Sequence, residues 1–254
     1  MAHKTLISGT AYSVTGGREL IGGTGYGCKA GKTLIGGTAF TVPFAKGILL
    51  STITPGAILY LNESGSPVPF YIAKHDYESG LNGAGRTLVV RKDCYDMRVF
   101  SNDGEVFKES ALHTWLNNTY LGFLSQTVKS EISTIRYASA IRIGPSSAYA
   151  GTSSARVIQL SGTELGGIDP KMIDEGSVLP IANTLKIAYR NGTKVNQWTR
   201  SIVNGNPGYV FYFTANGGMM SWYYSKVFGS RPAFTLPADT AVIANADGTY
   251  TLAA

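Results

Sequence analysis

The sequence contains few charged residues, and its positive charges are not clustered. Charged residues make up 15% of the 254 residues, whereas an average soluble domain has roughly 25%. The net charge is +6, and the 22 basic residues occur singly or in pairs. A protein that binds nucleic acid through its phosphates needs a dense basic patch. We therefore expect no nucleic-acid partner.

Histidine and cysteine are also scarce, which argues against a metal site. The chain has three histidines and two cysteines, Cys28 and Cys94. Two distant cysteines give neither a zinc spacing nor a disulfide framework, so we expect reduced, buried thiols, with pairing as the alternative. Four carboxylates between residues 93 and 105 lack the spacing of an EF-hand, and we interpret them as a solvated acidic turn. We expect no metal and no cofactor.

Long apolar runs are absent from the sequence. No window approaches the ~20 apolar residues of a membrane-spanning helix. The first residues, MAHKTLISGTAYSV, lack the charged segment and apolar core of a secretory signal. We expect a protein that is made in the cytoplasm and does not insert into a membrane.

Two nucleotide-binding motifs are almost matched near the N-terminus. The stretch AGKT ends like a P-loop, but Tyr26 stands where the motif needs its first glycine. Residues 25–30 formally fit a dinucleotide fingerprint, yet GKTLIGGT follows, which is too rich in glycine to open the required helix. Neither match predicts nucleotide binding.

Candidate catalytic groups lack suitable neighbours in the sequence. His75 and Asp76 are adjacent on an expected strand, so their side chains point to opposite faces. Cys94 follows Arg91, Lys92 and Asp93, and nearby cations could lower its pKa, but no histidine stands close in sequence to act as its base. We expect a protein that is not an enzyme.

A fourteen-residue repeat fills residues 1–44. The blocks KTLISGTAYSVTGG, RELIGGTGYGCKAG and KTLIGGTAFTVPFA begin at Lys4, Arg18 and Lys32. Each predicts two short extended segments around a Gly-Thr turn. Such a short unit cannot bury an apolar face alone, so we expect a β-rich anchoring or assembly module; a lead-in packed on the main domain is the alternative. The apolar positions expected at these contacts are Leu6, Ile7, Tyr12, Leu20, Ile21, Tyr26, Leu34, Ile35 and Phe40.

A second domain, expected to span residues 48–254, has a mixed pattern of helices and strands. Ser161 and Glu164 have the spacing of a helix capping box. GPSSAYAGTSS, at residues 144–154, predicts a flexible surface loop. The expected strands span residues 57–61, 69–73 and 87–91, and the expected helices span residues 110–120, 125–132 and 181–190.

A β-hairpin near the C-terminus carries many aromatic residues. Residues 208–215 and 219–228 are β-type runs separated by Asn-Gly-Gly, which supplies the positive φ angles of a tight turn. Side chains alternate along a strand, so one face is expected in the core while the other displays large apolar groups to a partner. Core packing of the whole set is the alternative. The expected ligand-binding residues are Tyr209, Phe211, Phe213, Asn216, Met220, Trp222 and Tyr224.

Several longer segments resemble a family of domains of unknown function that is frequent in phages and prophages of Gram-positive gut bacteria. The resemblance covers roughly residues 48–252, and the LIGGT repeats are similar to those of phage structural proteins. The segments that carry it are FYIAKHDYESGLNGAGRTLVVRKDCYD (70–96), LHTWLNNTY (112–120), IQLSGTELG (158–166), LKIAYRNG (185–192), WTRS (198–201) and SRPAFTLP (230–237).

That family is similar to the formylglycine-generating-enzyme branch of the C-type-lectin fold. The resemblance implies an α+β, C-type-lectin-like domain with ligand contacts on its late hairpin. It does not imply the enzyme's chemistry, because no cysteine pair stands near the C-terminus. By position, residues 202–228 resemble a variable display surface. The residues that resemble its scaffold are Trp198, Arg200, Arg231 and Pro232.

Together these features predict a non-enzymatic phage virion protein. The repeats would bind other virion proteins, and the second domain would bind a host surface glycan or protein, as in a tail fibre or receptor-binding protein. A capsid decoration protein or head fibre with a mainly structural role is the alternative. Because the repeats need partners, we expect a homo-oligomer, with a trimer as one option.

Overall fold

The computed structural model divides the chain into two units, Met1–Gly47 and Ile48–Ala254. Side chains are described from residue 47 on. Cys28 lies outside the described residues. The backbone is described for residues 3–7, 10–14, 18–21, 24–27, 30–35, 38–43, 47–144 and 146–253.

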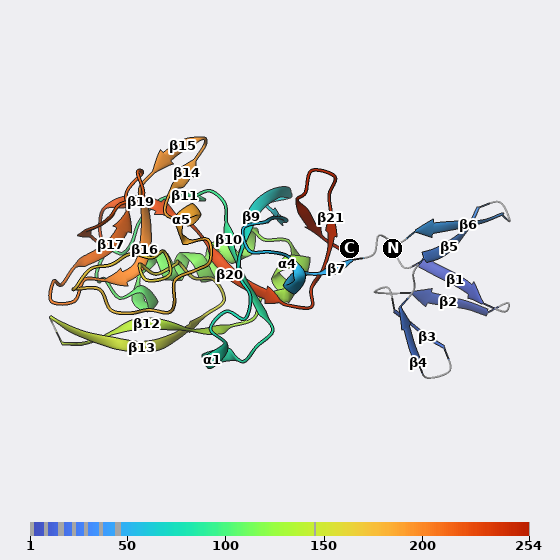
Figure 1. Ribbon diagram of the computed structural model, residues 1–254, viewed down its shortest axis with the longest axis horizontal. Helices are drawn as coiled ribbons and strands as arrows, with labels where there is room; N and C mark the ends of the chain where they lie inside the picture. The colour runs from blue at the N-terminus through green and yellow to red at the C-terminus, as the bar shows by residue number, and fades with distance from the viewer. Residues whose placement is uncertain are drawn as a thin grey trace. The chain divides into compact units, whose positions relative to one another are not determined.

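The first unit contains three two-stranded antiparallel hairpins, one for each repeat (Figure 1). Their registers are equivalent: Leu6 lies opposite Ala11, and the leucines of the other two repeats lie opposite Gly25 and Ala39. The nine expected assembly positions all lie on these strands. The hairpins are β1 (His3–Ile7) with β2 (Thr10–Val14), β3 (Arg18–Ile21) with β4 (Thr24–Gly27), and β5 (Ala30–Ile35) with β6 (Thr38–Pro43).

A seven-stranded sheet forms one part of the second unit, in the order β20-β10-β9-β8-β22-β21-β7. The predicted strands 57–61, 69–73 and 87–91 all lie in it. Ser64 and Gly65 have φ angles of 53° and 81°, so the turn between β8 and β9 uses the left-handed conformations of a tight hairpin. The strands are β7 (Ile48–Leu49), β8 (Ile58–Glu63), β9 (Ser66–Lys74), β10 (Arg86–Arg91), β20 (Ala233–Pro237), β21 (Ala241–Ala244) and β22 (Tyr250–Leu252).

A five-stranded sheet, in the order β11-β19-β16-β17-β18, contains the predicted C-terminal hairpin. The hairpin is confirmed: β17 and β18 pair antiparallel, and Gly217 in the connecting turn has a φ of 82°. β18 is an edge strand of this sheet. The strands are β11 (Asp96–Val99), β16 (Gln197–Ile202), β17 (Tyr209–Phe213), β18 (Met219–Tyr223) and β19 (Val227–Ser230).

The helices of the second unit are short. Ser110, the first residue of the helix predicted over 110–120, caps α2, because its Oγ accepts a hydrogen bond from the backbone N–H of His113 at 3.0 Å. Ser125 caps α4 in the same way. The helices are α1 (Ser79–Asn82), α2 (Ala111–Trp115), the π-helical turn η3 (Leu116–Tyr120), α3 (Leu121–Phe123), α4 (Gln126–Glu131) and α5 (Ala182–Leu185), with 3₁₀ turns η1 (Leu50–Thr52) and η2 (Phe107–Glu109).

The helix predicted over 181–190 is wrong beyond α5. Residues Ala188–Arg190 form β14, which pairs with β15 (Thr193–Val195) across a turn where Asn191 has a φ of 50°. The carbonyl of Leu185 accepts a hydrogen bond from Gln197 Nε2 at 2.7 Å, a bond that a continuing helix would have made within itself.

The surface loop predicted over 144–154 is also wrong. Residues Ser147–Ala155 form β13, which pairs along its whole length with β12 (Ile135–Gly144). Gly151 is needed in this hairpin, because a Cβ there would overlap the side chain of Ile141. Small and polar residues therefore allow close strand pairing here, where the sequence pattern favoured a loop.

The α+β, C-type-lectin-like fold class is contradicted by the element content. In the described part of the chain the structure is mostly β-sheet, and its few helices are short. The fold is β-rich. The sequence pattern overestimated the helices because apolar spacing cannot distinguish a short helix from segments that long-range pairing draws into strands.

The aromatic core of the five-stranded sheet surrounds Trp198, which is fully buried. Its ring centroid lies 4.6 Å from that of Phe228 and 5.6 Å from that of Phe100. Its Nε1 donates to the carbonyl oxygen of Arg98 at 3.0 Å, which satisfies the only polar atom of the indole. Trp198 therefore fixes the strand that lies beside the late hairpin.

Candidate binding surface

The two strands of the late hairpin differ sharply in exposure. On β17, Phe211 and Phe213 are 3% and 1% exposed. These two rings belong to the core and cannot contact a ligand in this structure, which corrects their predicted role. Tyr209, at the start of the same strand, is half-buried.

Strand β18 exposes three large side chains, whereas its partner β17 buries four of its five residues. Met220, Trp222 and Tyr223 are 53%, 45% and 43% exposed. Met220 and Trp222 share one face of the strand, and Tyr223 lies on the other. Because β18 is the edge of its sheet, neither face is covered as completely as on β17. The exposure of Tyr223 was not predicted, because the alternation of side chains along the strand placed Tyr223 on the face expected to lie in the core.

Three tyrosines form a cluster where β17 begins and β18 ends. The ring of Tyr223 lies 5.9 Å from that of Tyr209 at 81°, and 4.4 Å from that of Tyr224 at 28°. Tyr224 is half-buried, and its backbone carbonyl accepts a hydrogen bond from the N–H of Phe100 at 2.9 Å. Gly208 is required beneath the cluster, because a Cβ there would overlap the ring of Tyr223.

The turns on either side of β18 add polar and apolar groups. Asn216 is exposed in the turn that precedes β18. Beyond β18, the Nζ of Lys226 lies 5.6 Å from the ring centroid of Trp222, a cation–π contact, and Val227 is 50% exposed. One amide, one cation and one aliphatic side chain therefore border the exposed aromatic groups of β18.

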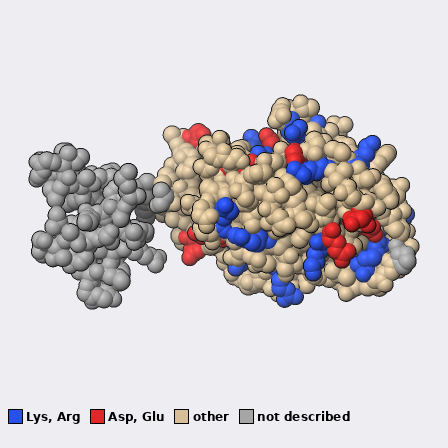
Figure 2. Space-filling view, turned by 180° about the vertical axis from the view of Figure 1, so that it is seen from behind, with Lys and Arg blue, Asp and Glu red and all other residues tan. Residues whose placement is uncertain are grey.

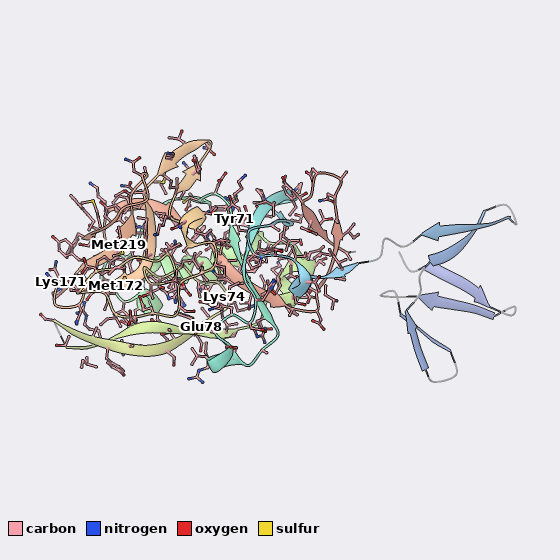
Figure 3. All side chains as sticks on the ribbon, in the orientation of Figure 1. Tyr71, Lys74, Glu78, Lys171, Met172 and Met219 are labelled. Carbon is pink, nitrogen blue, oxygen red and sulfur yellow. The ribbon has the colours of Figure 1, made fainter. Side chains whose placement is uncertain are left out.

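Within the unit 48–254, this hairpin lies at the end opposite to β7 and β21 (Figure 1). Met219, at the start of β18, lies at the same end as Met172 and Lys171 (Figure 3). The sulfur of Met219 lies against Gly167, and a side chain at position 167 would overlap this sulfur. The glycine thus allows the hairpin to pack closely on the loop before Met172.

The free end of the β12–β13 hairpin lies at this end as well. Asn204 connects this hairpin to the loop that contains Lys171. Its Oδ1 accepts a hydrogen bond from the N–H of Ala148 on β13 at 3.1 Å, and its backbone N–H donates to the carbonyl oxygen of Lys171 at 2.8 Å. Ile143 is 68% exposed and Tyr149 is 50% exposed. We define the distal surface as Ile143, Tyr149, Tyr209, Met220, Trp222, Tyr223, Tyr224 and Val227.

The surface of the second unit carries few charges. In the face shown in Figure 2, lysine, arginine and carboxylate side chains are scattered among larger uncharged areas. A partner of this protein therefore meets aromatic, aliphatic and amide groups more often than ions, and van der Waals and hydrogen-bond contacts would dominate its binding.

A buried polar network supports the sheet behind the distal surface. Arg200, on β16, is fully buried and pairs with Glu164, whose other carboxylate oxygen accepts from the hydroxyl of Tyr77 at 2.5 Å. Burial and the adjacent carboxylate raise the pKa of Tyr77 well above its ordinary value. The capping-box pair is formed as well: Ser161 Oγ accepts from the N–H of Glu164 at 3.0 Å, although no helix follows.

Glu175 forms a second part of this network. Its carboxylate accepts from the N–H of Ala140 at 2.8 Å and from the hydroxyl of Ser201. Burial raises the pKa of this carboxyl group. The partners of Glu175 and Glu164 are groups of β12 and β16 and of the segments at Tyr77 and Ser161, so the network ties β12 and β16 together and offers no open site.

The scaffold positions Trp198, Arg200, Arg231 and Pro232 are all buried. Arg231 donates to the carbonyl oxygens of Arg91 and Leu185, each at 2.8 Å. It therefore connects β10 to the end of α5. Sequence resemblance assigned these residues to the scaffold, and the structure places them there.

The candidate catalytic groups have separate structural partners. His75 Nδ1 shares a hydrogen bond with Thr87 Oγ1 at 2.9 Å, whereas Asp76 Oδ1 accepts from the N–H of Gly85 at 2.7 Å. Burial raises the pKa of the Cys94 thiol to about 11, which outweighs the cations Arg231 and Arg91. The thiol is therefore protonated at neutral pH, contrary to the effect expected from its basic neighbours.

Within the described part of the chain, no three His, Cys, Asp or Glu side chains are grouped as metal ligands. None of the helices over these residues has the length and apolar character that crossing a bilayer requires.

Comparison with known families gives one family match. A domain of unknown function, DUF6273, matches residues 84–238, which is more than half of the sequence. The chain belongs to the DUF6273 family. No curated protein and no solved structure matches it, so the lectin-like relationship has no support from these comparisons. The matched range includes Arg200, Glu164 and Glu175 of the buried network and the whole late hairpin.

Proposed function

We propose that this chain is a non-enzymatic adhesion protein of a phage particle, and that its distal surface binds the surface of the host cell. One observation carries the proposal: Met220, Trp222 and Tyr223 expose large apolar groups on one edge strand, with Met220 and Trp222 on the same face. Soluble monomers seldom expose such a group of large apolar side chains unless it contacts a partner. Tryptophan and tyrosine are also the residues that contribute most to binding at interfaces.

The placement of the distal surface supports an outward display. Ile48, where the second unit begins, lies on β7, at the end of that unit opposite to the late hairpin (Figure 1). The residues that precede Ile48 form three equivalent hairpins. Isolated two-stranded hairpins are marginally stable in water, so partners among virion proteins or other copies of the chain would stabilise them.

A host glycan is the partner that this chemistry favours. Sugar rings present apolar faces and hydroxyl groups, and amphipathic aromatic rings such as Trp222 and Tyr223 can contact both. The scarcity of charge on the surface of this unit suits a neutral partner better than an ionic one.

A binding assay on intact cells tests the proposal. Purified full-length protein is incubated with a panel of Gram-positive gut bacteria, and bound protein is measured against concentration. The test variant is Met220→Ser with Trp222→Ser, since both side chains are exposed. Tyr189→Ser is the matched control, because Tyr189 is 38% exposed on β14, outside the distal surface.

Saturable binding that the test variant loses and the control keeps is the expected result. Equal binding by both variants would contradict the role of the distal surface. If no cell type binds the wild-type protein, the adhesion function is wrong. The repeated hairpins then favour the alternative, a capsid decoration protein or head fibre, which electron microscopy of labelled particles would locate.

A further inference from the structure

The β12–β13 hairpin forms a sheet of its own along one side of the second unit (Figure 1). Side chains occupy the outer edge of β12. The Oδ1 of Asn82 accepts from the N–H of Arg136 at 2.8 Å, and its Nδ2 donates to the carbonyl oxygen of the same residue at 2.8 Å. The Nη2 of Arg200 donates to the carbonyl oxygen of Ala138 at 3.0 Å. The backbone groups of Arg136 and Ala138 therefore point away from β13.

The register of the hairpin then fixes where the backbone groups of β13 point. In an antiparallel pair, a residue that directs its N–H and C=O away from the partner strand lies opposite a residue that does the same. Arg136 lies opposite Ser154, and Ala138 lies opposite Thr152. The next residue of this row toward the hairpin turn is Ala150. These three residues of β13 direct their N–H and C=O groups to the free edge of the strand.

Asparagine side chains close this edge at both ends and leave its middle open. The Oδ1 of Asn204 accepts from the N–H of Ala148 at 3.1 Å, and the Oδ1 of Asn117 accepts from the N–H of Arg156 at 3.0 Å. The backbone groups that the three intervening residues direct outward have no hydrogen-bond partner within the described part of the chain. All three residues are exposed.

The strand also lacks the usual protection of a free edge. Natural edge strands are short, or they carry lysine, proline or a bulge that prevents pairing with another chain. β13 has nine residues, SAYAGTSSA, and none of them is charged or proline. The irregularity of this hairpin lies near its turn, between Arg142 and Gly144, away from the open stretch. The middle of β13 is therefore able to accept a further strand.

The open stretch fits a second copy of itself. It is centred on Thr152, with Ala150 and Ser154 two positions away on either side. Antiparallel pairing about a twofold axis at Thr152 would set Ala150 of each copy opposite Ser154 of the other. All three side chains are small and uncharged, so no like charges would face one another. The two copies would exchange about six N–H···O=C bonds.

We propose that β13 pairs antiparallel with β13 of a second copy of this chain, with Thr152 at the twofold axis. The pairing joins two β12–β13 hairpins into one continuous sheet. This inference goes beyond the adhesion function, because it concerns a different strand edge and does not depend on what the distal surface binds.

The strength of the contact follows from its size. A stable protein interface buries roughly 1,600 Å² in total, and a single short strand pair offers less. We expect a weak dimer that forms where copies are concentrated, as on a particle. Such a dimer carries two distal surfaces, which would strengthen attachment to a cell without any new contact.

Sedimentation velocity of the full-length protein over a wide concentration range tests the proposal. Thr152→Pro removes the central N–H, and an edge strand accepts proline where its N–H side faces solvent. Thr152→Ala is the matched control, because it keeps this N–H and removes only the side chain, including its bond from Arg136 Nη2 at 3.3 Å. Circular dichroism checks the folding of each variant.

A pair of charge variants tests the register itself. Thr152→Lys and Thr152→Glu each place like charges opposite one another at the twofold axis, whereas a mixture of the two places opposite charges there. Both substitutions change an exposed position, so folding should be retained.

The wild type and Thr152→Ala should reach twice their low-concentration mass as concentration rises. Thr152→Pro should weaken this association roughly tenfold or more, because two backbone hydrogen bonds are lost. Thr152→Lys and Thr152→Glu should each associate weakly alone and recover the doubled mass when mixed.

Three results would overturn the proposal: a wild-type mass that is independent of concentration, equal association of folded Thr152→Pro and Thr152→Ala, or no recovery in the mixture. The variant Met220→Ser with Trp222→Ser should still dimerise, since it alters only the distal surface. Loss of the dimer in that variant would place the contact on the distal surface and reject the pairing of β13. A complex that forms only with a strand of another protein would reject it as well. Failure of cell binding with dimerisation intact would contradict the adhesion function alone.

Discussion

The Nη1 atom of Arg200 lies 2.6 Å from the Oε2 atom of Glu164, and both side chains are completely buried. Glu164 also accepts from the backbone N–H of Ser161 at 2.8 Å. Arg200 donates to the carbonyl oxygens of Gln159 and Ala138. This ion pair is thus fully hydrogen-bonded, and it holds β16 and the hairpin beside it in place.

Glu164→Gln should destabilise the protein strongly. The change leaves the guanidinium of Arg200 buried without its counter-charge, and loss of one partner of a buried pair costs about 3–5 kcal/mol. Urea unfolding followed by circular dichroism measures the loss. Glu109→Gln makes the same chemical change at an exposed position and should stay within about 0.5 kcal/mol of the wild type. A small effect of Glu164→Gln would mean that the ion pair is not needed for the fold.

The buried Glu175 should make stability fall as pH rises above its ordinary pKa near 4.5. Burial raises the pKa of Glu175 in the folded state, so between the unfolded and folded pKa values the native protein binds more protons than the unfolded chain. The free energy of unfolding therefore decreases with pH over that window. Glu175→Gln should reduce this slope, measured as the urea midpoint from pH 4 to 8; the raised pKa of Glu78 contributes a slope of the same sign that stays. If the urea midpoints of the wild type and of Glu175→Gln change with pH in the same way, Glu175 does not contribute to the pH dependence of stability.

The two strands of the late hairpin should respond differently to truncation. Phe213→Ala should cost about 3–5 kcal/mol, because Phe213 is 1% exposed in the core. Trp222→Ala removes a larger side chain, yet it should change stability by only about 0.5 kcal/mol, because Trp222 is 45% exposed. Thermal unfolding compares the two variants. A severe loss in Trp222→Ala would show that this ring belongs to the core and not to a binding surface.

Gly208→Ala should disturb the tyrosine cluster specifically. Gly208 has a φ of 84°, and its new Cβ would overlap the ring of Tyr223. Gly205→Ala is the matched control, since Gly205 has a φ of 77° with no atom within 4 Å of a Cβ. Both variants should lose more than about 1 kcal/mol from the positive φ. Only Gly208→Ala should also change the near-ultraviolet circular dichroism of the tyrosines and weaken cell binding. Identical spectra and binding for the two variants would contradict the role of Gly208.

Cys94 should resist alkylation in the native protein. Its thiol is 3% exposed, and burial raises its pKa to about 11. Iodoacetamide at pH 7.5 should modify the peptide that contains Cys94 only after unfolding in urea, as measured by mass spectrometry. Rapid native modification would show that the thiol is accessible and ionised, and would restore the case for a reactive cysteine.

Local geometry was the most predictable part of the fold. The repeat period located the three N-terminal hairpins, and the Asn-Gly-Gly segment located the turn before β18. Ser110 was recognisable as a helix cap. These features depend on residues within a few positions of one another, so the sequence carries their whole physical cause.

The candidate binding surface was only partly predictable. Trp222 and Met220 were expected to bind a ligand and are exposed, whereas Phe211 was expected there and is in the core. Tyr223 and Tyr149 were missed because alternation placed one in the core and composition placed the other in a loop. No local signal states which strand lies at the edge of a sheet.

The sequence by itself therefore determined the turns, the caps, the repeat and the aromatic character of the late hairpin. The tertiary structure decided the β-rich fold, the pairing of β13 with β12, and the recruitment of the Ser161–Glu164 capping pair to Arg200 without a helix. It also decided which aromatic rings remain exposed. Turns form from neighbouring residues, but burial depends on strand pairing between distant segments, and that pairing is set by the packing of the whole unit.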